Sequence, residues 1–459
     1  MPVARSARRV EPGLSNRAAR FEAGKALRRR VPRSSHARWS APKGRPDPLE
    51  LLRASDRWRI SRLVPIRYGR MALSPFAFLR GSAAVMAYDL AGTPSTGLRV
   101  QLAGDAHASN FGIFATPERN RVFDVNDFDE TLPGPWEWDV KRLATSVTLV
   151  GRQNGATRAE TRRATRAAVR SYRLLISEYS RMRYLDTWYS HIDLESVDRL
   201  VRRAGRQVIG RAMARARRRT AFHAFPHLVE SVGGRWRIRD EPPLTVHYEG
   251  SGEETAARSF YDRYRRSLPE ERRMLLDRYR LVDVAQRVAG VGSVGTDCSV
   301  MLLLADGDVP DPLFLQLKQA LPSVLEPYAG ASAYRNPAQR VVTGQHLVQE
   351  ASDVFLGWGQ IGTKDVYVRQ LRDMKFSFDV GAMGPRALLG HAELCGSALA
   401  RAHARTGDPA AIAGYLGERD LFDRALVRFA EAYADQTERD HAELRRAIRR
   451  GRVAARLNA

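Results

Sequence analysis

Cysteine is scarce in this sequence, and long apolar runs are missing from it. Only Cys298 and Cys395 occur among 459 residues, which excludes a framework of several disulfides and a zinc site built from cysteines. No apolar run approaches the roughly 20 residues that cross a bilayer, and the arginine-rich start lacks the apolar core of a signal peptide. The sequence therefore predicts a soluble, cytoplasmic protein without membrane insertion.

Lysine is rare as well. Six lysines occur among 75 basic residues, so arginine carries almost all of the positive charge behind the formal net charge of +24. Arginine binds phosphate bidentately, which makes a polyanion such as nucleic acid a candidate partner. The alternative is that arginine serves wherever a solvated cation is needed, because the arginines are spread along the chain and no nucleic-acid-binding motif is recognisable.

The segment from 104 to 139 is rich in acids and has the sequence GDAHASNFGIFATPERNRVFDVNDFDETLPGPWEWD. Its polar residues form two clusters next to segments of strand character. The first cluster contains Asp105, His107 and Asn110, and the second contains Asp124, Asp127 and Asp129. Carboxylates are too costly for a sheet core and belong at strand ends lining a cleft. A hairpin through ATPERNR would bring the clusters together, and oxygen ligands of this kind suit Mg²⁺ beside a phosphate.

Four segments follow from composition and periodicity. Residues 1–48 are basic and poor in large apolar residues, so we expect a flexible arm that is a candidate for polyanion contact. Residues 49–280 carry the acidic clusters and several helices, including one from Glu253 to about 280. Residues 281–380 are rich in strands, and residues 381–459 are helical.

A glycine loop lies in the strand-rich segment, with Gly290, Gly292, Ser293 and Gly295 in GVGSVG. In a dinucleotide-binding fold this motif opens a helix, but here the strand-like CSVMLLLA follows. A glycine loop between antiparallel strands instead indicates the kinase type, in which the loop covers phosphates.

Lys318 lies in LFLQLKQA, on the same side of a strand as Phe314 and Gln316. A lysine kept in an arginine-rich chain indicates that a compact point charge is needed, although a lysine that snorkels from a strand end is the alternative. A kinase lysine needs a carboxylate partner. Glu350 is the first candidate for this partner and Glu326 the second.

Two groups of motifs carry a resemblance. GDAHASN resembles the GDxHxxN catalytic loop of aminoglycoside and choline phosphotransferases, and VNDFDETLPGPWEWDVKRLA resembles their metal-aspartate segment. GVGSVG with LFLQLK resembles the nucleotide lobe of the same superfamily. From about residue 50 the chain also resembles the bacterial family called domain of unknown function 2252, through SPFAFLRG, GDAHASNFG, GVGSVGT and VVTGQHLVQEASDVFLGW among other blocks.

The resemblance implies an α+β, protein kinase-like fold of two lobes with a large helical lobe, and an ATP- and Mg²⁺-dependent phosphotransferase. Asp105 would orient the attacking hydroxyl, and His107 would orient the loop. The implied metal residues are Asn110 and Asp127, with Asp124 and Asp129 as further metal or outer groups. The implied nucleotide-binding residues are Gly290, Gly292, Ser293, Gly295, Lys318 and Glu350.

The order of the motifs is reversed relative to ordinary kinases, because Asp105 precedes Lys318 by some two hundred residues. This predicts a circular permutation, in which the helices of residues 381–459 complete the helical lobe. The permuted site requires Lys318 to lie within about 15 Å of Asp127, since one nucleotide triphosphate has to bridge them.

Other functions remain open at this point. A nucleotide-binding pseudokinase or a basic nucleic-acid-binding scaffold would keep the fold without turnover. A metal-dependent phosphohydrolase is suggested by GDAH, but the GNH block of calcineurin-like phosphatases is missing. The acceptor, whether a small molecule or a protein, is not determined by the sequence.

Overall fold

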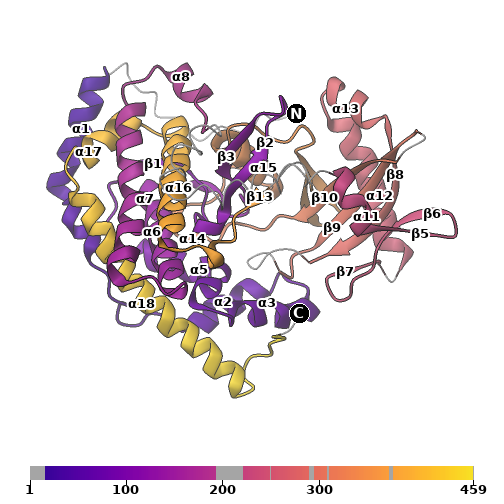
Figure 1. Ribbon diagram of the computed structural model, residues 1–459, viewed down its shortest axis with the longest axis horizontal. Coiled ribbons are helices and arrows are strands. Elements are labelled where there is room, and N and C mark those ends of the chain that lie inside the picture. The colour runs from indigo at the N-terminus through magenta and orange to yellow at the C-terminus, as the bar shows by residue number, and fades with distance from the viewer. Residues whose placement is uncertain are drawn as a thin grey trace.

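The computed structural model describes residues 16–192, 221–248, 250–288, 294–307, 310–371 and 376–457. It is an α+β structure in which a large helical part lies beside a smaller part built on a six-stranded antiparallel sheet (Figure 1). Short strands and helices lie between the two parts. The glycine-loop residues Gly290, Gly292 and Ser293 lie outside the described residues, as do residues 1–15 of the expected arm.

The helical part combines segments from both ends of the chain. Its N-terminal helices are α1 (Arg17–Arg30), η1 (Arg33–Ala37), α2 (Pro48–Asp56), η2 (Ser61–Leu63), α3 (Val64–Met71), α4 (Pro75–Gly81) and α5 (Ala83–Ala91). Its central helices are α6 (Trp136–Gln153), α7 (Arg158–Tyr179) and α8 (Tyr184–Tyr189). Its C-terminal helices are η4 (Val380–Ala382), α16 (Pro385–Thr406), α17 (Pro409–Leu416) and α18 (Leu421–Arg449). No helix in the described segments is long and apolar enough to cross a membrane.

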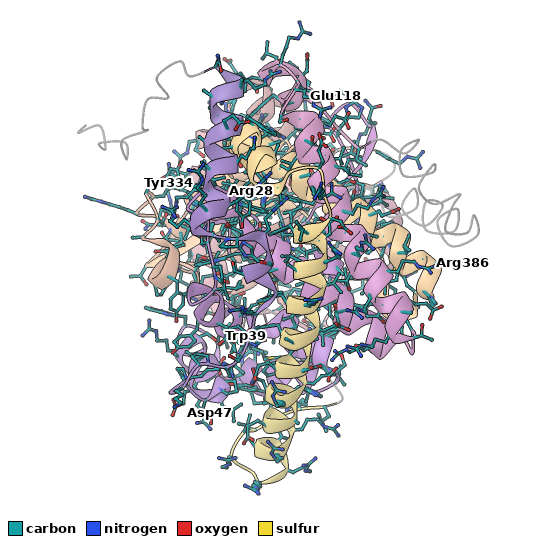
Figure 2. All side chains as sticks on the ribbon, turned by 90° about the vertical axis from the view of Figure 1, so that its left-hand side faces the viewer. Arg28, Trp39, Asp47, Glu118, Tyr334 and Arg386 are labelled. Atoms are coloured by element: carbon teal, nitrogen blue, oxygen red, sulfur yellow. The ribbon has the colours of Figure 1, made fainter. Side chains whose placement is uncertain are left out.

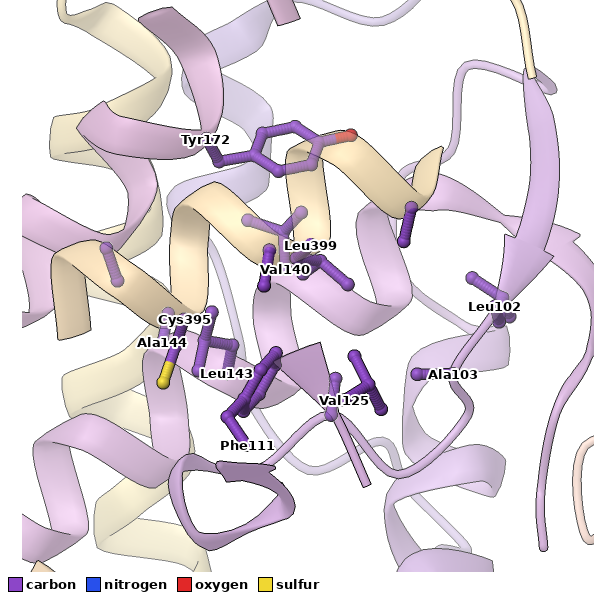
Figure 3. Packing of buried hydrophobic residues seen from close by; sticks show 14 of the residues in the cluster. Leu102, Ala103, Phe111, Val125, Val140, Leu143, Ala144, Tyr172, Cys395 and Leu399 are labelled. Atoms are coloured by element: carbon purple, nitrogen blue, oxygen red, sulfur yellow. The ribbon is translucent and has the colours of Figure 1, made fainter. Parts of the chain in front are cut away.

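Helices α6 and α7 lie on either side of a turn at Gly155. Thr157 and Glu160 form a capping box at the start of α7, in which each side chain accepts a hydrogen bond from the other residue's backbone N–H. Trp136 of α6 stacks on Tyr172 of α7 at 5.7 Å between ring centroids. Cys395 and Leu399 of α16 lie in the same cluster of buried residues as Val140 and Tyr172 (Figure 3).

The flexible arm expected for residues 1–48 is wrong for its described portion. Helix α1 packs directly on α17, where a Cβ on Gly24 would lie 1.9 Å from the Ala411 carbonyl oxygen. Arg28 donates from Nε to the Tyr415 carbonyl oxygen at 2.9 Å, between the two helices (Figure 2). Small residues thus allow close backbone contact, and arginines that look merely solvated in sequence cap the carbonyls at the end of α17.

The larger sheet has the strand order β11-β12-β10-β9-β8-β7, with every pair antiparallel. Its strands are β7 (Thr245–Val246), β8 (Tyr279–Arg287), β9 (Cys298–Ala305), β10 (Asp311–Gln319), β11 (Gly357–Ile361) and β12 (Lys364–Gln370). The strand expected after the glycine loop is β9, and the strand expected to carry Lys318 is β10. Adjacent helices and strands are α11 (Ala221–Leu228), β5 (Val229–Val232), β6 (Arg235–Ile238), α12 (Ser251–Ser267) and α13 (Glu270–Leu276).

Both faces of this sheet are buried, which explains its continuous apolar strands. Alternate residues of β9 and β10 pack against α12 on one face and against α11 with the β5–β6 hairpin on the other. The single helix expected from Glu253 to about 280 is instead two helices, because the chain turns at Leu268 and Pro269.

Two small sheets accompany the helical part, and the one with β2, β3 and β13 lies toward the larger sheet (Figure 1). One pairs β1 (Arg99–Leu102) with β4 (Leu132–Pro135), and the other joins β13 (Phe376–Ser377), β2 (Phe111–Ala115) and β3 (Arg121–Val125). The turn η3 (Ala108–Asn110) precedes β2, and α14 (Glu326–Ala329) and α15 (Pro337–Val348) follow β10. The hairpin predicted through ATPERNR is β2–β3, and it returns the second acidic cluster beside the first.

Candidate active site

A cavity of about 250 Å³ lies where the two acidic clusters meet the end of β10. It is lined by Asp105, His107, Asn110, Asp127 and Asp129 from the acidic segment, by Arg59, Arg67 and Arg80 from the chain between α2 and α5, and by Thr296, Gln319 and Arg369 from the sheet part. Residues far apart in the sequence therefore share one space. This cavity is the candidate active site.

The loop that carries Asp105 is held by Asp139, in the first turn of α6. The backbone N–H groups of Ala103 and Gly104 donate to the Asp139 carboxylate at 2.7 and 3.1 Å. Gly104 has φ +82°, and a Cβ at this position would lie 2.2 Å from the Glu130 carbonyl oxygen. Only glycine fits this turn, which brings the loop against the second acidic cluster. Ala103 follows Leu102 at the edge of the apolar core (Figure 3).

Asp105 is oriented by a buried arginine of α6. Arg142, whose side chain is 3% exposed, donates from Nε to Asp105 Oδ1 at 2.6 Å and from Nη2 to the Leu79 carbonyl oxygen at 2.9 Å. Asp105 Oδ2 lies 3.7 Å from His107 Nε2. One carboxylate oxygen is thus fixed, and the other remains on the side of His107.

His107 is buried and its ring meets Phe76 edge-on at 6.1 Å between centroids. Burial, followed by the positive charges of Arg80 and Arg142, holds the pKa of His107 well below its usual range. The imidazole is therefore neutral at physiological pH. This fits an orienting role better than the role of an acid that exchanges protons near pH 7.

Asn110 joins the two acidic clusters. Its Nδ2 donates to the backbone carbonyl oxygens of Asp105 at 3.0 Å and Asp127 at 3.1 Å. The backbone N–H of Asn126 also donates to the Asn110 carbonyl oxygen at 3.0 Å. The side-chain nitrogen is committed to the loops, so Oδ1 is the atom left for a ligand.

Lys318 reaches the acidic segment from β10. Its Nζ forms an ion pair with Asp129 and lies 3.8 Å from Asp127 Oδ1, and the lysine side chain is only 2% exposed. The distance is far inside the limit of about 15 Å set by one nucleotide triphosphate. Tyr367, which pairs with Lys318 across β10 and β12, donates its hydroxyl to Asp129 Oδ1 at 2.7 Å.

Lys318 and Asp129 form a strong ion pair, whereas the charge of Asp127 is less well compensated. Burial lowers the pKa of Lys318, but Asp127 and Asp129 outweigh burial and raise it. For Asp129, burial raises the pKa, but Lys318 and its hydrogen bond outweigh burial and lower it. For Asp127, desolvation and the charge of Asp129 raise the pKa in spite of Lys318. A further cation near Asp127 would therefore be favourable.

The fit of a metal ion depends on Asp127 and Asn110. No group of three or more His, Cys, Asp or Glu side chains in the described segments is arranged to hold a metal. Mg²⁺ in phosphotransferases needs fewer protein ligands, because one or two carboxylates and the substrate phosphates hold it. The Asp127 side chain is 42% exposed in the cavity, and Asn110 Oδ1 accepts no hydrogen bond from the part of the chain that the structure describes. These two residues fit a phosphate-bound Mg²⁺, whereas Asp129 is already engaged by Lys318 and Tyr367.

Comparison with known families identifies residues 59–447 as a match to the bacterial family described as "Uncharacterized protein conserved in bacteria (DUF2252)". The chain belongs to this family. Searches of curated proteins and of solved structures returned no match. The DUF2252 match includes the GDAHASN motif, Lys318 and the arginines of the cavity from Arg59 onward, so the cavity belongs to the family domain.

Asp124 was expected at the metal, and the structure places it elsewhere. It lies within β3, is fully buried, and forms an ion pair with Arg401 of α16. It also accepts the backbone N–H of Glu350 at 2.8 Å. Asp127 and Asp129 follow the end of β3 and line the cavity. Asp124 is therefore a structural acid, although it lies only a few residues before two acids of the site.

Neither expected acid is the partner of Lys318. Glu350 lies 4.0 Å from His191, and burial raises its pKa to about 7. Glu326 accepts the backbone N–H of Ser323 at 3.0 Å. The expectation failed because it required a helix to supply the acid, whereas Asp129 comes from the loop after β3.

The end of the glycine loop lies at the cavity. Gly295 has φ +90°, its carbonyl oxygen accepts the backbone N–H of Ile60 at 2.7 Å, and Arg59 Cβ lies 3.1 Å from the position of an added Cβ. Thr296 lines the cavity itself. The part of the glycine loop that the structure describes therefore contacts the chain at Arg59 and Ile60.

Several functional candidates were missed by sequence reasoning. They are Arg59, Arg67, Arg80, Arg142, Tyr367 and Arg369. Tyr367 and Arg369 oppose Lys318 and Gln316 in the β10–β12 register, so strand alternation would have found them once this pairing was known. The arginines carried no such signal in a chain where arginine is the default cation.

Proposed function

We propose that this protein is an ATP-dependent phosphotransferase with a circularly permuted, kinase-like arrangement of two lobes. The observation that carries the proposal is the approach of Lys318 Nζ to 3.8 Å from Asp127 Oδ1, a residue that lines the same cavity as Asp105. These residues come from segments about 190 positions apart in the chain. Their meeting supports a site that works on one polyphosphate.

The order of strands supports the nucleotide lobe. In protein kinases a glycine-rich loop covers the phosphates and the lysine stands on the third strand. Here the loop joins β8 to β9, and Lys318 stands on β10, with β8, β9 and β10 adjacent and antiparallel. This local order supports the comparison with a kinase nucleotide lobe, although the lobe follows the proposed catalytic loop in the chain.

In the proposed reaction, an acceptor hydroxyl attacks the γ-phosphorus of ATP. The new bond joins the acceptor oxygen to phosphorus, the bond between phosphorus and the β–γ bridging oxygen breaks, and ADP leaves with the electron pair. Asp105 takes the hydroxyl proton, and Arg142 holds this carboxylate in place. Lys318 and Arg369 offset the charge of the phosphates. Mg²⁺ held by Asp127 and Asn110 would neutralise further phosphate charge.

Binding of Mg²⁺ and ATP tests this proposal. Saturating Mg²⁺–ATP should raise the unfolding temperature by about 2–3 °C, because a ligand at a hundred times its Kd adds about 2.7 kcal/mol of stability. Asp127→Asn and Lys318→Met should remove this shift, whereas Asp105→Asn should keep it and lower turnover by about a hundredfold or more. A wild-type protein that shows no shift with millimolar Mg²⁺–ATP would contradict the proposal.

A matched control separates the site from general effects of charge. Lys364 lies on β12, and its Nζ pairs with Asp297 at 2.6 Å with 46% of the lysine side chain exposed. It does not line the cavity. Lys364→Met should retain the full shift with Mg²⁺–ATP, so loss of the shift in this variant as well would show that the assay responds to net charge.

A nucleotide-binding pseudokinase is the second candidate. It is favoured by one observation, namely that Lys318 pairs with Asp129 rather than with an acid from a helix. Both functions require binding of Mg²⁺–ATP. Transfer of labelled phosphate from ATP to pools of small molecules or proteins distinguishes them, because a pseudokinase binds the nucleotide without transferring phosphate.

A further inference from the structure

Three arginines form one side of the cavity, and we call them the arginine wall. Arg59, Arg67 and Arg80 come from the chain between α2 and α5, and all three line the same space as Asp105 and Asp127. The proposed transfer reaction gives none of them a role. Their charges therefore require an account of their own.

The arginine wall carries more positive charge than its own acids balance. Asp56 Oδ1 lies 2.7 Å from Arg67 Nη1 and 3.6 Å from Arg59 Nε, so one carboxylate serves two arginines. Arg80 has no ion-pair or hydrogen-bond partner within the described ranges, and its Nε is buried without one. The surplus on this wall is two positive charges.

The neighbouring acids do not remove this surplus. Asp105 is held by Arg142, and Asp129 is held by Lys318. Glu130 also lines the cavity and its charge acts on Arg59, but burial raises the pKa of Glu130 and so disfavours its charged form. Glu130 also accepts the Val324 backbone N–H at 2.8 Å and the Ser323 hydroxyl at 3.1 Å. The acids of the site are thus committed elsewhere, or serve the metal in the case of Asp127.

Burial makes this arrangement costly. Desolvation lowers the pKa of Arg80 despite the nearby charges of Asp105 and Asp127. Desolvation followed by the charge of Arg67 lowers the pKa of Arg59 to about 10. Cations that remain uncompensated when buried are stabilised by an anion that enters the cavity.

We propose that the arginine wall binds a phosphate group of the acceptor, so that the substrate class is a hydroxyl compound that already carries a phosphate monoester. A phosphate monoester is close to a dianion at neutral pH, which matches the two surplus charges. The arginine fork binds phosphate bidentately. Arg80 lines the same cavity as Asp105, to which the proposed reaction assigns the acceptor hydroxyl, so we assign this anion to the acceptor.

This assignment rests on the proposed phosphotransferase function and makes it more specific. The γ-phosphoryl group moves as described above, and the second phosphate only anchors the acceptor. The assignment also disfavours cationic acceptors of the aminoglycoside kind, because their ammonium groups would face Arg80 across a partly desolvated cavity. Binding energy from a remote anion of this kind positions the hydroxyl for attack.

Inorganic phosphate is the probe for this subsite. It is titrated by calorimetry into the full-length protein saturated with Mg²⁺ and AMP-PNP, a non-hydrolysable ATP analogue, and acetate serves as the carboxylate arm. We expect phosphate to bind the nucleotide complex and acetate to bind at least about tenfold more weakly. Arg80→Gln should weaken phosphate binding by about tenfold or more and leave the Kd of AMP-PNP within about twofold.

Two variants keep this test independent of folding. Arg80→Lys retains the charge without the fork and should give an intermediate phosphate affinity. Arg57→Gln removes an exposed arginine outside the cavity and should leave both affinities unchanged. Phosphate binding that AMP-PNP abolishes, or that Arg80→Gln leaves intact, would overturn the acceptor subsite. Absence of AMP-PNP binding would instead refute the phosphotransferase, and with it the acceptor role of the arginine wall.

Discussion

Replacement of Lys318 by methionine is the most informative perturbation of the site. The change keeps most of the side-chain length. It removes the ammonium charge that lies beside both Asp127 and Asp129. Loss of one partner from a fully buried ion pair costs about 3–5 kcal/mol. Here the Asp129 side chain is 27% exposed and keeps the Tyr367 hydroxyl at 2.7 Å, so we expect about 2 kcal/mol.

The effect should depend on pH in a direction that follows from the shifted pKa values. The lowered pKa of Asp129 contributes stability above the unfolded pKa of about 4, and this is lost as the pH falls through the folded pKa. The raised pKa of Lys318 contributes throughout this range, because its unfolded pKa is about 10.4. Without Lys318, both acids resist ionisation in the folded state. The stability difference between wild type and variant should therefore grow from about pH 4 to about pH 7.

Thermal unfolding followed by circular dichroism measures this difference. For a chain of 459 residues, 1 kcal/mol corresponds to about 1 °C, so Lys318→Met should lower the unfolding temperature by about 2 °C near pH 7.5 and by much less near pH 4.5. Lys364→Met, which breaks a largely exposed pair, should change it by about 1 °C or less at both values. A Lys318→Met variant whose deficit grows toward acid pH would refute the ion-pair argument.

Three further predictions concern residues around the site. Arg401→Leu leaves the fully buried Asp124 without its cation and should cost about 3–5 kcal/mol in thermal unfolding, with partial recovery when Asp124→Asn is added. Gly155→Ala, at a positive φ in open space, should lower the free energy of unfolding by about 1–2 kcal/mol through backbone strain. Gly104→Ala should cost more than this, because φ is +82° and a backbone oxygen also lies 2.2 Å from the new Cβ. Burial raises the pKa of Glu350 to about 7, so this carboxyl ionises at lower pH in the unfolded chain than in the folded protein. The free energy of unfolding should therefore fall from about pH 4 to pH 7. Glu350→Gln should flatten this slope in thermal melts at several pH values.

Local patterns were sufficient for much of the fold. The β2–β3 hairpin, the break between α6 and α7, and the three strands around the glycine loop follow from turn residues and apolar periodicity, which act over a few neighbouring positions. The flexible arm was wrong because the docking of α1 on α17 depends on contacts with residues nearly 400 positions away.

The site divides in the same way. The spacing in GDAHASN and NDFD marked Asp105, Asn110, Asp127 and Asp129 as polar groups at strand ends, where carboxylates remain near water. The sequence also distinguished Lys318, because a lysine stands out among arginines.

Only the tertiary structure decided which charges meet. Asp124 pairs with Arg401 inside the core, Lys318 pairs with Asp129, and the arginine wall faces Asp105 across the cavity. Coulomb energy depends on distance and burial, and for residues distant in the chain both are set by the packing of helices and sheets. Residue types and short spacings thus determined the chemistry that is available, and the fold determined which groups are combined in one site.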